Sequence, residues 1–153
     1  MIVPHSSVIL LIDDSADDRF LLRRSFEKAG IINPIQEASS GREAIEYLNG
    51  EGRFGNRAAY PFPGILFVDL NMPGVDGFDV LEWVRNKLEV RGVLIIVLSR
   101  LDELKQVNRA YTLGANSFLT KPGEERELEG LIRAFKDYWL LKNKAPEIRA
   151  GST

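Results

Sequence analysis

Three carboxylates, one hydroxyl and one lysine in this sequence are of the types that phosphate chemistry needs. Asp13, Asp14 and Asp69 each come after a short apolar run, and Ser99 and Lys121 come after two later runs. Carboxylates within a few ångströms of one another repel, so a proton, a lysine or a metal ion must neutralise part of their charge. All-oxygen ligation suits a hard cation such as Mg²⁺. A carboxylate beside Mg²⁺, a lysine and a hydroxyl is equipped to accept a phosphoryl group.

Apolar runs alternate with amphipathic segments, and this alternation predicts the elements that position those residues. The predicted strands are Val8–Ile12, Ile35–Ala38, Ile65–Val68, Val93–Leu98 and Ser117–Thr120. The predicted helices are Ala16–Ala29, Gly41–Leu48, Phe78–Asn86, Glu103–Leu113 and Glu124–Leu141. Five strands alternating with five helices favour an α/β fold, a doubly wound parallel sheet of the flavodoxin-like type. In the strand order 2-1-3-4-5, the candidate residues meet at the carboxyl edge, where such sheets bind ligands.

Length and composition limit the possible functions. The 153 residues fit one domain, with a core of about residues 7–141 and a polar tail over 142–153. A net charge of -2 and a pI of about 5.5 give no reason to expect nucleic-acid binding. The absence of cysteine excludes disulfides, and the longest apolar run is too short to cross a membrane. We expect a cytoplasmic protein with no nucleic-acid or membrane partner. The Gly- and Pro-rich segment 49–63 is predicted to be a long loop at the sheet end away from Asp69.

Several short motifs occur in one order along the chain, and together they are specific. They are IDD at 12–14, VDLNMPGVDG at 68–77, LS at 98–99, Lys-Pro at 121–122, and Phe118 three residues before the lysine. With these motifs the sequence resembles a response-regulator receiver domain over about residues 8–140. It is most similar to the stand-alone receivers that pair with bacterial phytochromes, which share the YPFP-type loop and a YWL-x-x-N ending, here 138–143.

The resemblance implies a role for each site residue. Asp69 would be the phosphoacceptor, and Asp13, Asp14, Asp69 and the backbone carbonyl of Asn71 would hold Mg²⁺. Mn²⁺ or Ca²⁺ would substitute for it in crystals. Ser99 and Lys121 would contact the phosphoryl group. Ser99 and Phe118 would form the switch, and the Lys121-Pro122 peptide bond would be cis.

The resemblance also implies partners. The protein would be a phosphoacceptor of two-component signal transduction rather than an enzyme with a separate substrate, and would catalyse its own phosphorylation and dephosphorylation. A sensor histidine kinase of the phytochrome type would be the donor, and no DNA-binding domain would follow. We also expect a homodimer through the C-terminal helix, because its last side chains lie beyond the sheet. These are Tyr138, Trp139, Leu140 and Leu141. The alternative is that Trp139 folds back onto its own chain.

Other functions remain open. Acidic residues after strands are common turn formers, and Phe118 could be an ordinary core residue. A metal-dependent phosphatase also uses paired carboxylates two residues apart, but residue 71 is asparagine here. Arg100 follows Ser99 where receivers usually carry a small residue. It could crowd the phosphoryl group or pair with it, and crowding would favour a degenerate receiver that binds partners without phosphorylation.

Overall fold

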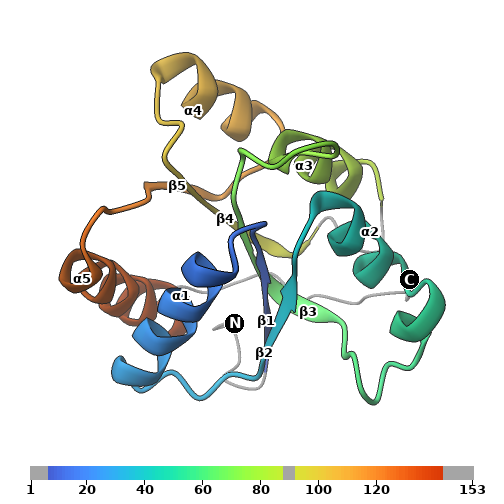
Figure 1. Ribbon diagram of the computed structural model, residues 1–153, viewed down its shortest axis with the longest axis horizontal. Coiled ribbons are helices and arrows are strands. Elements are labelled where there is room, and N and C mark those ends of the chain that lie inside the picture. Colours follow the sequence, from blue (N-terminus) through green and yellow to red (C-terminus); the bar gives the residue numbers. More distant parts are fainter. Residues whose placement is uncertain (1–6, 88–91, 143–153) are drawn as a thin grey trace.

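A parallel sheet forms the centre of the computed structural model, which describes residues 7–87 and 92–142 (Figure 1). Within these residues the order of the strands is β2-β1-β3-β4-β5, and every neighbouring pair is parallel, so the predicted fold class and order are confirmed. The strands are β1 (Val8–Ile12), β2 (Ile35–Ala38), β3 (Pro63–Val68), β4 (Leu94–Ser99) and β5 (Ser117–Thr120).

The inner strands are buried on both faces, which explains their unbroken apolar sequences. All residues of β1 and β4 are buried, whereas the edge strands β2 and β5 are mostly half-buried. Ser99 is the last residue of β4 rather than the first residue after it, and it is completely buried. The strand therefore places this hydroxyl at the edge of the sheet without exposing it.

Two helical layers cover the sheet (Figure 1). Helices α1 (Ala16–Lys28) and α5 (Glu125–Phe135) lie on one face. The other face carries α2 (Gly41–Asn49), α3 (Gly77–Arg85) and α4 (Leu104–Thr112). Alternate residues of each strand point into two separate cores, one for each layer. No helix among the described residues is long and apolar enough to cross a lipid bilayer.

The predicted long loop lies where the sequence placed it, at the amino end of β3, but it is not featureless. A short 3-10 helix, η1 (Gly52–Gly55), buries Phe54 in a ring cluster with Tyr47 and Tyr60. Arg57 donates to the carbonyl of Tyr47 at 2.8 Å and so binds the last turn of α2. These contacts attach the segment to the layer of α2 and α3.

The C-terminal helix departs from the prediction. Helix α5 ends at Phe135, and a π-helical turn, η2 (Lys136–Leu140), continues it. The wider turn carries Leu140 inward, where it is completely buried, and Trp139 packs against the same core. Leu140 is therefore not among the exposed residues of the predicted cluster, and Trp139 folds back onto its own chain, as the alternative expected. Tyr138 and Leu141 remain 55% and 43% exposed. Residues 143–153 of the predicted tail lie outside the described part of the chain.

Candidate functional site

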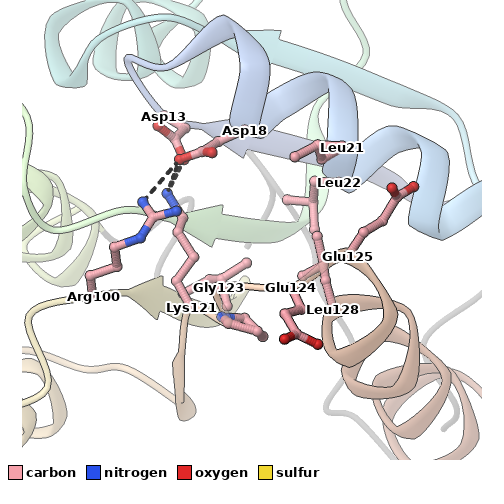
Figure 2. A pocket seen from close by; sticks show the side chains of 12 residues that line it. Asp13, Asp18, Leu21, Leu22, Arg100, Lys121, Gly123, Glu124, Glu125 and Leu128 are labelled. Atoms are coloured by element: carbon pink, nitrogen blue, oxygen red, sulfur yellow. Dashed lines mark hydrogen bonds and ion pairs between the residues drawn. The ribbon is translucent and has the colours of Figure 1, made fainter.

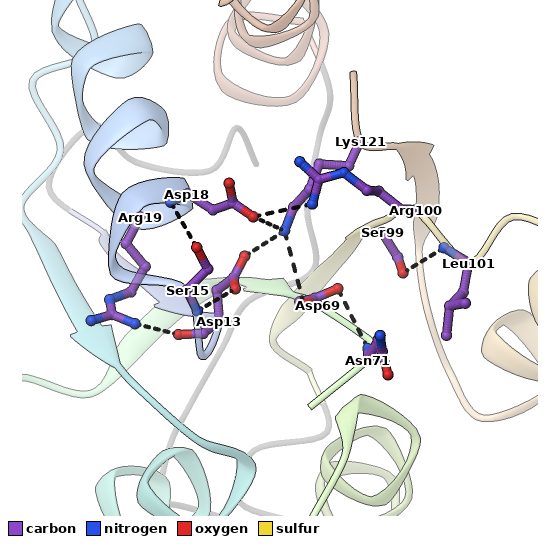
Figure 3. Close-up of polar contacts among 10 residues, drawn as sticks. All are labelled: Asp13, Ser15, Asp18, Arg19, Asp69, Asn71, Ser99, Arg100, Leu101 and Lys121. Atoms are coloured by element: carbon purple, nitrogen blue, oxygen red, sulfur yellow. Dashed lines mark hydrogen bonds and ion pairs between the residues drawn. The ribbon is translucent and has the colours of Figure 1, made fainter. Parts of the chain in front are cut away.

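The predicted site residues converge at the carboxyl edge of the sheet (Figure 2 and Figure 3). Three of them stand one residue past a strand and are held there by a backbone hydrogen bond to the neighbouring strand. Asp13 donates to the carbonyl of Ala38 at 3.2 Å, and Asp69 donates to that of Ile12 at 2.9 Å. Lys121 donates to that of Ser99 at 2.9 Å. The sheet itself therefore fixes where these side chains begin.

The acidic residues form one cluster. Carboxylate oxygens of Asp13, Asp14 and Asp69 lie within 4.8 Å of one another, with Asp13 and Asp69 buried and Asp14 exposed. Three carboxylates with one open side suit Mg²⁺, which binds through a few carboxylates and keeps several waters. The residues present therefore fit the metal. The backbone N–H of Asn71 donates to Asp69 Oδ1 at 3.4 Å, and the use of the Asn71 carbonyl as a ligand stays a prediction.

The carboxyl group of Asp69 is held in an unfavourable environment for a negative charge. Burial is the main reason, and it raises the pKa of Asp69 to about 6. The Lys121 ammonium opposes this increase, while the carboxylates of Asp13 and Asp14 add to it. A divalent cation among the three carboxylates would relieve this repulsion, so metal binding and ionisation of Asp69 favour each other.

Lys121 lies closer to two other carboxylates than to Asp69. Its Nζ is 2.6 Å from Asp13 Oδ2, 2.8 Å from Asp18 Oδ2 and 3.9 Å from Asp69 Oδ2. The side chain is only 8% exposed. Burial by itself would lower the pKa of Lys121, but the hydrogen bonds to Asp13 and Asp18 outweigh it and raise this pKa. The lysine therefore stays charged at the edge of the sheet.

The predicted cis peptide bond between Lys121 and Pro122 is wrong, because no described residue has a cis bond. A trans bond before proline is favoured by about 0.5–1 kcal/mol unless local packing opposes it. With the trans bond, the Lys121 N–H continues the hydrogen bonding between β5 and β4, and its side chain still reaches Asp13.

The two predicted switch residues occupy different environments. The Ser99 hydroxyl accepts a hydrogen bond from the Leu101 N–H at 3.1 Å, so its hydrogen is left to donate. Phe118 is half-buried against the core on the α4 side, and its N–H donates to the Tyr111 hydroxyl at 3.1 Å. The switch role of both residues stays a prediction.

Sequence reasoning missed Asp18. Its N–H donates to the Ser15 hydroxyl, as expected at the start of α1, but its carboxylate accepts from Lys121 and, at 3.2 Å, from Arg100 (Figure 3). Burial favours its protonation, yet these two hydrogen bonds hold the pKa of Asp18 below its usual value. The sequence signal that could have identified Asp18 is its position in the first turn of the helix that follows Asp14, which places it near the same edge of the sheet.

Arg19 was also missed. It donates to the backbone carbonyl of Asp13 and, through Nε, to Glu37 on β2 at 2.7 Å. Arg19 therefore attaches the turn after β1 to the edge strand β2. Arg23 of the same helix also pairs with Glu37. These contacts orient Asp13, although no pattern in the sequence links Arg19 to a residue so far along the chain.

A pocket of about 70 Å³ opens beside the cluster, between α1 and α5 (Figure 2). Charged side chains of Asp13, Asp18, Arg100 and Lys121 line one end. The remaining lining residues are Leu21, Leu22, Leu98, Pro122, Gly123, Glu124, Glu125 and Leu128. Asp69 and Asp14 do not line this pocket, but they meet Asp13 and Lys121 at the same edge of the sheet, where Asp14 is exposed. This arrangement can bind a divalent cation and stabilise added negative charge on Asp69.

Comparisons with known proteins agree with this chemistry. The sequence model of the response regulator receiver domain family matches residues 9–133. Response regulator Rcp1 of Synechocystis sp. is 27% identical over 133 residues, which are 87% of this chain and 88% of Rcp1. The structure of its Mn²⁺-bound form has a TM-score of 0.83, at 26% identity over 92% of this chain and 99% of that one.

Two further solved structures are similar. Response regulator RPA3017, in red light signaling of R. palustris, has a TM-score of 0.85 at 30% identity, covering 95% of this chain and 99% of that one. The bacteriophytochrome response regulator AtBRR has a TM-score of 0.72 at 33% identity, covering 92% and 100%. The predicted similarity to phytochrome-associated regulators is confirmed.

Proposed function

This chain belongs to the response regulator receiver domain family, and we propose that it accepts a phosphoryl group on Asp69 from a sensor histidine kinase. The observation that carries the proposal is the position of Asp69. It is a buried carboxylate whose pKa is raised to about 6, within 4.8 Å of an acidic pair and 3.9 Å from Lys121. The protein acts as a signalling switch that promotes its own phosphorylation and dephosphorylation.

The chemistry follows from these residues. An Asp69 carboxylate oxygen attacks the phosphorus of a phosphohistidine, the new P–O bond forms as the P–N bond breaks, and the imidazole nitrogen keeps the electron pair. Asp13, Asp14 and Asp69 would hold Mg²⁺, which neutralises charge on the phosphoryl oxygens. Ser99 donates its hydroxyl hydrogen to the phosphoryl group. Dephosphorylation is a separate step, in which water attacks the phosphorus, the P–O bond to Asp69 breaks, and inorganic phosphate, a proton and the Asp69 carboxylate are released.

The donor we propose is a phytochrome-type histidine kinase in the cytoplasm. Support comes from the similarity to AtBRR and to RPA3017, the latter described in red light signaling. The test mixes the purified protein with a phosphorylated phytochrome-type kinase and, separately, with a phosphorylated kinase of another sensor class. Faster transfer from the phytochrome-type kinase is expected, and a preference for the other kinase contradicts this donor.

Acceptance on Asp69 is tested without a kinase. The protein is incubated with acetyl phosphate and Mg²⁺, and its intact mass should increase by one phosphoryl group. Asp69→Asn should abolish the increase, whereas Asp137→Asn, at an exposed carboxylate in η2, should keep it. A phosphorylated Asp69→Asn protein would contradict the assignment, and an unmodified wild-type protein would favour the partner-binding receiver without phosphorylation.

We also propose a homodimer through the C-terminal segment. With Leu140 and Trp139 packed inward, the exposed Tyr138 and Leu141 are the apolar side chains of this segment that a second copy can cover. The double variant Tyr138→Ser, Leu141→Ser should dissociate the dimer in sedimentation while retaining phosphorylation. Sedimentation of the wild-type protein as a monomer, with and without phosphate, contradicts the dimer.

A further inference from the structure

Neither the proposed metal site nor the proposed acceptor uses Asp18, although its carboxylate pairs with two cations at the same edge of the sheet. Its Oδ2 is 2.8 Å from Lys121 Nζ and 3.2 Å from Arg100 Nη1 (Figure 3). Lys121 Nζ also lies 3.9 Å from Asp69 Oδ2, and Arg100 directly follows Ser99, the predicted phosphoryl-binding hydroxyl, so both cations belong to the edge where a phosphoryl group on Asp69 would add charge. Asp18 and that group would therefore compete for the same cations.

We propose that Asp18 is a positioning residue that pairs with Lys121 and Arg100 before phosphorylation. When Asp69 is phosphorylated, both cations leave Asp18 and bind the phosphoryl oxygens. This inference rests on the proposed function and deepens it, because it makes Arg100 a second phosphoryl-binding cation. It also means that Asp18 opposes phosphorylation by competing for the cations that stabilise the product.

The difference in charge gives the direction of the transfer. Asp18 offers one negative charge, whereas a phosphoryl group brings a charge of about −1.5 to −2 and three strong acceptor oxygens. Lys121 already spans the gap, since its Nζ touches Asp18 and lies 3.9 Å from Asp69. A small movement of one ammonium group exchanges one partner for the other.

Arg100 is free to make the same exchange. Its side chain is 62% exposed, and its ion pair with Asp18 is long and open to solvent. Solvent-exposed pairs of this kind contribute little to stability, so little is lost when this one breaks. A guanidinium can then form two parallel hydrogen bonds to phosphoryl oxygens, a geometry that an ammonium cannot match.

Asp18 can remain charged after both cations leave. It is the third residue of α1, in the first turn, where the helix N-terminus stabilises a carboxylate. Its N–H stays bonded to the Ser15 hydroxyl at 3.2 Å, and that bond does not involve the Asp18 carboxylate. The start of α1 therefore persists when the carboxylate changes partners or is replaced by an amide.

Equilibrium binding of trifluoroberyllate, which mimics a phosphoryl group on a carboxylate, tests the inference in the presence of Mg²⁺. Asp18→Asn should bind trifluoroberyllate about two- to fivefold more tightly than the wild type, the range of one partly exposed ion pair. Arg100→Ala should bind it more weakly by a similar factor. Asp17→Asn removes the same charge from the exposed neighbouring residue and should leave the affinity unchanged.

The double variant Asp18→Asn, Arg100→Ala separates a specific exchange from a general charge effect. The gain from Asp18→Asn should shrink when Arg100 is absent, because the two residues are coupled. Melting temperatures check that all variants are folded. If Asp18→Asn and Asp17→Asn bind trifluoroberyllate with equal affinity, Asp18 does not compete for the two cations and the proposal is overturned. A wild-type protein that binds no trifluoroberyllate would instead contradict the proposed function itself.

Discussion

Gly77 stands against the backbone of Asp69 so closely that a Cβ atom at residue 77 would lie 2.3 Å from the Asp69 carbonyl oxygen. The Gly77 N–H donates to the carbonyl of Leu70 at 3.1 Å, so the first residue of α3 is attached to the loop that carries the acceptor. The glycine that closes the VDLNMPGVDG motif is therefore required by close packing, since its φ is not positive.

Gly77→Ala should destabilise the fold and reduce phosphorylation together. A methyl group has no room between backbone atoms, and overpacking of this kind costs about 1–3 kcal/mol. The helix propensity of alanine would act in the opposite direction. Denaturant unfolding and intact mass after acetyl phosphate treatment measure both effects. Gly123→Ala is the matched control, because its Cβ would meet nothing within 4 Å. Equal behaviour of the two variants would show that the contact is unimportant.

Asp69→Asn should stabilise the metal-free protein near neutral pH. The pKa of Asp69 is about 6 in the folded protein and about 3.9 in an unfolded chain, so folding takes up a proton between these values. The contribution of Asp69 to stability is thus fully present below pH 4 and is lost as the pH rises through 6. Asparagine removes that loss.

The expected gain for Asp69→Asn is about 3 kcal/mol near pH 7, and it should vanish near pH 4. Urea unfolding at both pH values measures it, and added Mg²⁺ should reduce the gain because the ion stabilises the wild-type carboxylate. A gain of the same size at both pH values would mean that ionisation of Asp69 is not its cause.

Mg²⁺ should raise the melting temperature through Asp14. At ten times its dissociation constant, a ligand that binds only the folded state adds about 1.4 kcal/mol. Asp14→Ala should remove most of this gain, and Asp17→Ala, at an exposed carboxylate outside the cluster, should retain it. An undiminished response in Asp14→Ala would exclude Asp14 as a principal ligand.

Leu140→Ala and Leu141→Ala should differ sharply although the residues are adjacent. Leu140 is completely buried, and its truncation should cost about 2–5 kcal/mol. Leu141 is 43% exposed, so its truncation should have a small effect on the stability of the monomer. Unfolding measured at low protein concentration compares them, and a larger loss for Leu141 would contradict the register of the π-helical turn.

The sequence was sufficient to predict the order of the strands and most of the residues at the carboxyl edge of the sheet. Buried strands read as unbroken apolar runs, and the carboxyl end of each run marks a position at the same rim, so Asp13, Asp69 and Lys121 were placed without coordinates. The same signal could not show that Lys121 pairs most closely with Asp13 and Asp18, because such a choice depends on distances between side chains.

Other features depended on geometry that the sequence pattern does not encode. The burial of Leu140 could not be predicted from a regular helical period, because the π-helical turn adds a residue to the turn and changes which side chain faces the core. The cis bond at Pro122 was carried over with the resemblance rather than required by any local pattern. Phe54 was missed because a Gly-rich segment gives no period from which burial can be inferred.

The sheet divides the molecule into two cores that share no helix, and the site lies across the boundary between them. Asp18 lies in the first turn of α1 in one layer, whereas Gly77, against Asp69, is the first residue of α3 in the other. Phosphorylation of Asp69 can thus change two opposite surfaces of the protein, one through α1 and the other through α3. Two partners, one bound on each surface, could respond to the same phosphoryl group without competing for one binding surface.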